Sequence, residues 1–119
     1  MFQEGSTAQQ QLDELQAVLK FDYGDQDWGI VNADRTRVAE FTQFFEANHD
    51  ATWAEWTVAE FVDLVLESAS DAVRADAGFP VQCLDRFLAV AAPRAPDSIA
   101  YWTSRDWAIT PHLRALGLP

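Results

Sequence analysis

The sequence predicts an all-α protein, a compact bundle of five to six helices that forms a single domain over residues 1–119. Apolar residues recur at three- and four-residue spacing in several segments, the pattern of helices with one buried side. No run of alternating apolar and polar residues is long enough to build a sheet. Hydrophobic residues make up 49% of the chain and aromatic residues 13%, which is enough for a core.

The first predicted helix covers residues 6–20. Ser6 or Thr7 offers a hydroxyl N-cap, and leucine and valine side chains follow at helical spacing. The glutamine run at 9–11 is expected to lie on the solvated side of this helix. Residues 1–6 precede it without apolar periodicity and are expected to be disordered.

A turn-rich connector is predicted over residues 21–32, before the second helix. Two glycines and three aspartates fall within eight residues of this segment, and both residue types favour turns. The second helix is expected to begin near Asn32 or Asp34, each a plausible N-cap, and to end near Asn48. Phenylalanine and valine side chains form its apolar stripe.

The third helix, over about residues 52–77, is predicted to be the central one. Thr52 and Glu55 have the spacing of a capping box, in which each side chain satisfies the other's backbone N–H. The middle of the segment is apolar around most of its circumference, so this helix should be packed on several sides. Gly78 is its expected stop.

Three shorter helical segments complete the predicted bundle. Pro80 suits the first turn of a fourth helix, because that position needs no backbone N–H, and Pro93 and Pro96 end it. A fifth helix is expected over residues 97–102. A last helical turn covers residues 110–117.

Charge is divided unequally along the chain. Residues 1–71 carry fifteen acidic and three basic side chains, a net charge of −12, whereas residues 72–119 carry four acidic and five basic ones, a net charge of +1. Together they give the −11 of the whole chain. A surface of one sign attracts cations and repels polyanions. We therefore expect the acidic part to bind a basic partner and the balanced part to serve as scaffold.

The composition argues against several partners. Eight basic side chains against nineteen acidic ones cannot neutralise the phosphates of a nucleic acid or of an anionic membrane. No apolar run approaches the roughly 20 residues of a membrane span, and the N-terminus lacks the pattern of a signal peptide. The single cysteine, Cys83, cannot form an internal disulfide. These features predict a cytoplasmic protein, either a monomer or a homodimer.

No motif for catalysis, a cofactor or a metal is recognisable in the sequence. A calcium loop begun at Asp25 would need glycine at its sixth position and glutamate at its twelfth, where the chain has Ile30 and Thr36. His49 and His112 do not have the spacing of a zinc site. There is no nucleophile elbow and no glycine-rich phosphate loop. The expected protein is not an enzyme and holds no cofactor.

Two acidic segments that also carry aromatic residues are the candidate partner-binding sites. One is the connector, and the other is a stripe on the third helix whose members are four, three and four residues apart and therefore share one side of it. Such a stripe is either a solvated helix surface or a binding ridge, in which the aromatic residue anchors the partner and the charges steer it. The candidate contacts are Asp22, Asp25, Asp27, Trp28, Trp56, Glu60, Asp63 and Glu67.

Three segments of the chain have distinctive motifs. Residues 27–41 place an acidic-Trp segment before an expected Asp-capped helix with a Glu-Phe step, and residues 99–104 and 109–114 contain a Tyr-Trp pair and a TPxxR pattern. These segments resemble those of a family of small bacterial immunity proteins that accompany polymorphic toxins, whose closing segments are an EYWS-type motif and a TPxxR ending. The resemblance spans about residues 20–115. This chain departs from it at Ala100, where the pattern often has glutamate, and in the middle of the third helix.

The resemblance implies a helical immunity protein that binds a cognate toxin and blocks it. Together with the charge, it predicts that acidic residues of the first part steer a basic toxin, such as a nuclease or another secreted effector, and that aromatic residues anchor it. The alternative is a non-enzymatic adaptor or regulatory module whose exposed aromatic residues bind another protein's helix or a second copy of the chain.

Overall fold

Helices make up the framework of the molecule, and the all-α prediction is confirmed. The computed structural model describes residues 1–24 and 26–118. Within these residues the α-helices are α1 (Ala8–Leu19), α2 (Trp28–Val31), α3 (Val38–Asn48), α4 (Glu55–Ala75), α5 (Asp85–Ala91), α6 (Pro96–Thr103) and α7 (Thr110–Ala115). Two 3₁₀ turns flank α5, namely η1 (Val81–Leu84) and η2 (Ala92–Arg94). Five of the α-helices have seven or more residues.

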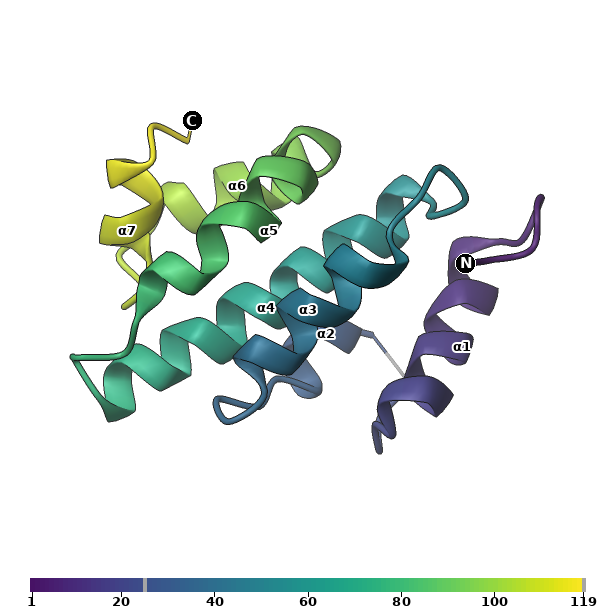
Figure 1. Ribbon diagram of the computed structural model, residues 1–119, viewed down its shortest axis with the longest axis horizontal. Helices are drawn as coiled ribbons and strands as arrows, with labels where there is room; N and C mark the ends of the chain where they lie inside the picture. The colour runs from purple at the N-terminus through teal and green to yellow at the C-terminus, as the bar shows by residue number, and fades with distance from the viewer. Residues whose placement is uncertain (25, 119) are drawn as a thin grey trace.

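The long helix α4 lies at the centre, as the sequence predicted. Helices α1, α2 and α3 contact it, and so do η2 and α6, which belong to the C-terminal group of helices, α5 to α7. In Figure 1, α1 lies on one flank of α4 and the group α5 to α7 lies on the other. Most of α4 is buried because apolar side chains point outward on several of its sides.

Aromatic rings form the centre of the core, around Phe45 of α3. Its ring meets those of Trp53 and Phe87 edge to face, with centroids 5.1 and 5.0 Å apart, and that of Phe61 at 5.6 Å. These rings come from α3, α4, α5 and the loop before α4. Because each such pair adds about 0.5–1.5 kcal/mol beyond the burial of its area, this cluster holds the helices in one arrangement.

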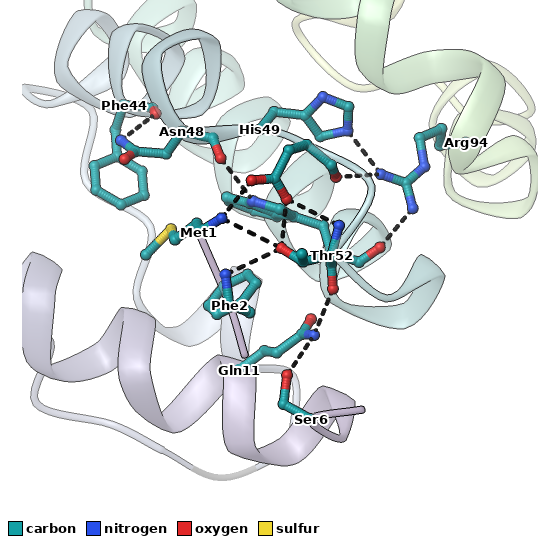
Figure 2. A network of polar contacts seen from close by, with 11 residues as sticks. Met1, Phe2, Ser6, Gln11, Phe44, Asn48, His49, Thr52 and Arg94 are labelled. Carbon is teal, nitrogen blue, oxygen red and sulfur yellow. Dashed lines mark hydrogen bonds and ion pairs between the residues drawn. The ribbon is translucent and has the colours of Figure 1, made fainter. Parts of the chain in front are cut away.

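The N-terminal residues are ordered, which corrects the expectation of disorder over residues 1–6. Phe2 is buried, and its ring packs edge to face on Trp53 at 5.1 Å. The backbone N–H of Phe2 donates to the hydroxyl of Thr52 at 3.0 Å, and the N-terminal amine pairs with Asp50 (Figure 2). Apolar periodicity could not predict this order, because a single aromatic side chain, that of Phe2, anchors residues 1–6.

Gln11 of α1 caps the central helix, so two expectations are wrong. Its side-chain oxygen accepts from the backbone N–H of Ala54 at 2.9 Å and from the hydroxyl of Thr57 at 2.6 Å. Its side-chain nitrogen donates to the carbonyl oxygen of Thr52 at 2.8 Å (Figure 2). Gln11 is thus buried and not solvated, and α4 has no capping box, since Ala54 is its N-cap and the Thr52 hydroxyl bonds to Asp50.

Replacement of Gln11 by alanine should lower the free energy of unfolding by about 1–3 kcal/mol, because it leaves buried polar groups without partners. Gln9→Ala is the matched control, since Gln9 lies on the exposed side of the same helix. The control should change the free energy of unfolding by less than about 0.5 kcal/mol. Urea unfolding followed by circular dichroism measures both, and equal effects would contradict the role of Gln11 as a cap.

Other element boundaries also differ from the prediction. The second predicted helix, α3, begins at Val38, because Asp34 accepts from the backbone N–H and hydroxyl of Thr36 and closes a turn there. The central helix ends at Ala75, before Gly78. The expected fourth helix begins as the 3₁₀ turn η1 after Pro80. In the described part of the chain, no helix combines the length and apolarity that crossing a membrane requires.

Candidate functional site: an acidic face on α2, α4 and α6

The short helix α2 lies against the polar stripe of α4 and shapes the candidate site. The expected turn-rich connector contains this helix, which Asp27 precedes in a left-handed conformation with φ of 58°. Asp adopts this conformation more readily than most residues. The backbone N–H of Gly29 in α2 donates to the carboxylate of Glu60 in α4 at 3.2 Å.

Gly29 permits this contact because it has no side chain. A Cβ atom at this position would lie 2.3 Å from the carbonyl oxygen of Glu60 and 2.8 Å from the backbone nitrogen of Leu64. Both are backbone atoms of α4, so neither can move aside without moving the helix. Any larger residue therefore separates α2 from α4.

Gly29→Ala should lower the free energy of unfolding by about 1–3 kcal/mol, the usual cost of overpacking. It should also shift the NMR signals of residues along α2 and the facing turns of α4. Gly78→Ala is the control, because a Cβ at Gly78 would meet only the Asp76 side chain, at 3.3 Å. If the two variants are equally stable, the close approach of α2 to α4 is not the reason for glycine at position 29.

Two clefts open beside α2, and Asp27 lines both of them. The first, here called the α1 cleft, has a volume of about 660 Å³ and lies between α1, the connector and α4. Trp56 stands at this cleft with 64% of its surface exposed, the largest exposure of any bulky hydrophobic residue described. The cleft is lined by Gln9, Leu12, Gly24, Gln26, Asp27, Trp28, Trp56 and Glu60.

The second, the α6 cleft, lies between α2, α4 and α6. Its volume is about 310 Å³, and three aspartates meet in it. Asp63 is held in place by Trp102 of α6, whose indole N–H donates to its carboxylate at 3.0 Å. The cleft is lined by Asp27, Ile30, Asp63, Asp97, Ser98 and Tyr101.

Six residues of the two clefts carry the charge and the large exposed rings, and we call them the acidic face. They are Asp27, Trp56, Glu60, Asp63, Asp97 and Tyr101. Asp27 belongs to both clefts and so joins them into one surface. Among the described residues, no lysine, arginine or histidine lines either cleft. Arg105 lies at the edge, with its guanidinium over the ring of Tyr101 at 4.8 Å.

The carboxylates of the acidic face are not neutralised. None of the four forms an ion pair with another described residue. Burial raises the pKa of Glu60 above its ordinary value, and the negative charges of Asp63 and Asp27 add to this effect. Burial likewise raises the pKa of Asp63, with a further contribution from Asp27. The folded protein therefore holds negative charges close together at a cost in free energy.

The arrangement suits the binding of cationic side chains better than the binding of a metal. Within the described residues, no group of three or more carboxylate, histidine or cysteine side chains could hold a metal ion. Exposed rings beside uncompensated carboxylates provide apolar contact for the stem of a lysine or arginine and charge for its head.

The structure separates the eight candidate contacts into groups. Asp27, Trp56, Glu60 and Asp63 come together in the acidic face, but Glu60 is only 8% exposed. Trp28 is 2% exposed and packs on Phe21, so its ring belongs to the core and cannot serve as an exposed anchor. Asp22, which is exposed on the connector, and Glu67, which lies further along α4, line neither cleft. Asp25 falls outside the described residues.

The sequence analysis missed Asp97 and Tyr101, which α6 brings into the α6 cleft. They are four residues apart in sequence and therefore lie on the same side of α6, a spacing that was available as a signal. Both belong to residues 72–119, the part expected to act only as scaffold. The candidate surface thus draws on both parts of the chain.

Comparison with known proteins identifies no relative of this chain. The chain matches no protein-family model, no curated protein and no solved structure. Its function is therefore inferred from the geometry and charge of the acidic face.

Proposed function

We propose that this protein is an immunity protein, which binds a basic toxin through the acidic face and blocks it without catalysing a reaction. The observation that carries the proposal is the set of four carboxylates in the acidic face, none of which forms an ion pair with another described residue. Of these, Glu60 is buried and Asp63 is half-buried, and natural proteins seldom keep such like charges together unless function requires it, because each raises the cost of ionising the other.

The geometry supports a division of roles within the face. Asp27 and Asp97 are exposed and would attract a cationic partner from a distance, which increases the rate of association. Trp56 and Tyr101 would then contact the partner, since large rings supply much area for little loss of side-chain freedom. Glu60 and Asp63, which are less exposed, would pair with basic side chains that enter the clefts.

Charge also favours a different protein over a second copy as the partner. A symmetric dimer across this surface would place the four carboxylates of one copy against those of the other. Such like-charge contacts are strongly unfavourable at an interface. The adaptor alternative shares the surface but predicts a partner that is not a toxin.

Co-expression in a bacterial host with the toxin domain encoded directly upstream of this gene tests the proposal. The wild-type protein should restore growth, and the purified pair should form a 1:1 complex. Trp56→Ala should weaken the complex about thirtyfold, which corresponds to a loss of about 2 kcal/mol at a central aromatic contact.

Tyr23→Ala is the matched control for this variant. Tyr23 is 58% exposed but lines neither cleft, so its loss should leave affinity unchanged. The immunity proposal is wrong if no toxin lies upstream or if growth is not restored. The assignment of the acidic face is wrong if Tyr23→Ala and Trp56→Ala weaken the complex equally.

A further inference from the structure

Arg94 joins the C-terminal group of helices to the loop that precedes α4. One guanidinium nitrogen lies 2.7 Å from Nε2 of His49, and the same nitrogen donates to the carbonyl oxygen of Asp50 at 3.4 Å. The other donates to the carbonyl oxygen of Trp53 at 2.5 Å (Figure 2). This set of contacts, here called the Arg94 junction, includes none of the six residues of the acidic face.

The junction requires a neutral His49. A guanidinium group has donors only and stays protonated at any ordinary pH, so Nε2 of the imidazole must be the acceptor. The ring proton then lies on Nδ1. Packing holds the ring in this orientation, because it stacks on Phe45 with centroids 4.5 Å apart and lies 6.0 Å from the ring of Trp53.

Four charged groups surround His49, and each comes from a different part of the fold. Arg94 faces it from η2, and Asp50 follows it in the loop. Glu46 of α3 and Arg86 of α5 line the same hollow but pair with each other at 3.4 Å. Asp50 accepts hydrogen bonds from the N-terminal amine and Thr52, which hold the pKa of its carboxyl well below the usual range. Burial and then Arg94 lower the pKa of His49, whereas Asp50 opposes them.

The same loop also holds α1 in place through hydrogen bonds. Thr52 accepts from Phe2 through its hydroxyl and from Gln11 through its carbonyl oxygen, and Ala54 donates to Gln11. The position of α1 therefore depends on the position of the loop, which Arg94 fixes from the opposite side.

We propose that the Arg94 junction is a pH-sensitive latch: a proton taken up at Nε2 of His49 replaces the acceptor by a donor, breaks the contact with Arg94, and loosens the loop and the attached α1. The latch is fully closed above the pKa of an unfolded histidine, about 6.5. Below that value the open form binds more protons than the closed form, so acidification favours opening.

NMR of the full-length protein between pH 7.5 and pH 5.5 tests the latch in two ways. Imidazole nitrogen shifts at pH 7.5 should identify His49 as the neutral form protonated at Nδ1. Amide-exchange protection factors, corrected for intrinsic exchange, should fall for Trp53 and Ala54 as the pH drops below about 6.5. The protection factors should fall by at most tenfold per pH unit, because uptake of a single proton cannot change the opening equilibrium more steeply. Protection of Ile99 in α6 should stay constant.

Two variants separate His49 from other causes. His49→Gln should keep protection at Trp53 and Ala54 constant over this range, because its side-chain oxygen can accept from Arg94 and does not titrate. His112→Gln should behave as wild type, since His112 pairs with Asp85 at the far end of the C-terminal group.

Three results would overturn the proposal. The first is a proton on Nε2 at pH 7.5, which is measured on the wild type and needs no variant to fold. The second is an unchanged pH dependence in His49→Gln. The third is an equal loss of protection at Ile99, which would indicate global unfolding instead of a local opening.

Discussion

Replacement of Trp53 by alanine is expected to lower the free energy of unfolding by about 3–5 kcal/mol, the largest stability effect of any substitution considered. Trp53 is 1% exposed, and its ring contacts those of Phe2, Phe45 and Phe61 at 5.1 to 5.5 Å. Its indole N–H also donates to the carbonyl oxygen of Asn48 at 3.1 Å. The variant loses contact area, edge-to-face pairs and a hydrogen bond together, and leaves a cavity.

Trp56→Ala is the control for this experiment because the same side chain is removed three residues further on. Trp56 is 64% exposed, so its loss should change the free energy of unfolding by no more than about 0.5 kcal/mol. Urea unfolding followed by circular dichroism measures both variants. A chain of 119 residues is expected to unfold in a single step, which allows the two values to be compared. Similar losses in both variants would contradict the placement of Trp53 in the core.

Neutralising the acidic face should slow association with a basic toxin about ten- to a thousandfold at low ionic strength, the range in which electrostatic steering acts. The variant combines Asp27→Asn, Glu60→Gln, Asp63→Asn and Asp97→Asn. Each new amide keeps an oxygen that can accept the existing hydrogen bonds, and asparagine tolerates the left-handed backbone at position 27. Stopped-flow association rates measure the effect.

The salt dependence and a matched control complete this test. At about 1 M salt, where charges are screened beyond about 3 Å, the variant and the wild type should associate at nearly the same rate. Glu4→Gln, Asp13→Asn, Glu14→Gln and Asp106→Asn remove the same charge from exposed positions outside both clefts. If this control slows association as much as the first variant does, total charge matters and the acidic face does not.

The same neutralised variant should be more stable than the wild type at pH 7. The pKa values of Glu60 and Asp63 are raised in the folded protein, so the folded state binds more protons than the unfolded state above about pH 4. The free energy of unfolding of the wild type therefore falls as the pH rises from about 4 through the raised pKa values of Glu60 and Asp63. The variant does not lose this stability, because its amides do not ionise. The advantage should disappear as the pH falls below about 4, because Glu60 and Asp63 of the wild type then become protonated in the unfolded state as well as in the folded state. Gain of stability with loss of binding is the expected signature of a functional surface.

Local patterns predicted the parts of the fold that depend on neighbours in sequence. The spacing of apolar residues identified α1 and the central α4, because a helix buries side chains that recur every three or four residues. Gln11 was misplaced for the opposite reason. Its partners, Thr52, Ala54 and Thr57, are 41 to 46 residues away, and a glutamine beside two others gives no sign of them.

The candidate site also depends on contacts between distant residues, which local sequence patterns do not reveal. The stripe on α4 was recognised from its spacing, but the short helix that covers part of it depends on the fit of Gly29 to the backbone of α4. Composition alone makes residues 22–29 a turn, so the burial of Trp28 could not be foreseen. Asp97 and Tyr101 reach the face only because Trp102, beside them in α6, packs on α4 and donates to Asp63.

The cap that Gln11 supplies also bears on the order in which the molecule folds. The first backbone N–H groups of a helix have no partner within the helix, and Ala54 finds its partner 43 residues earlier in the chain. Bringing such distant residues together costs chain entropy that a local cap would not. The first turn of α4 should accordingly become ordered after its middle, at the step in which α1 docks. We therefore expect the completion of the longest helix to depend on the docking of a different helix as well as on its own helical propensity.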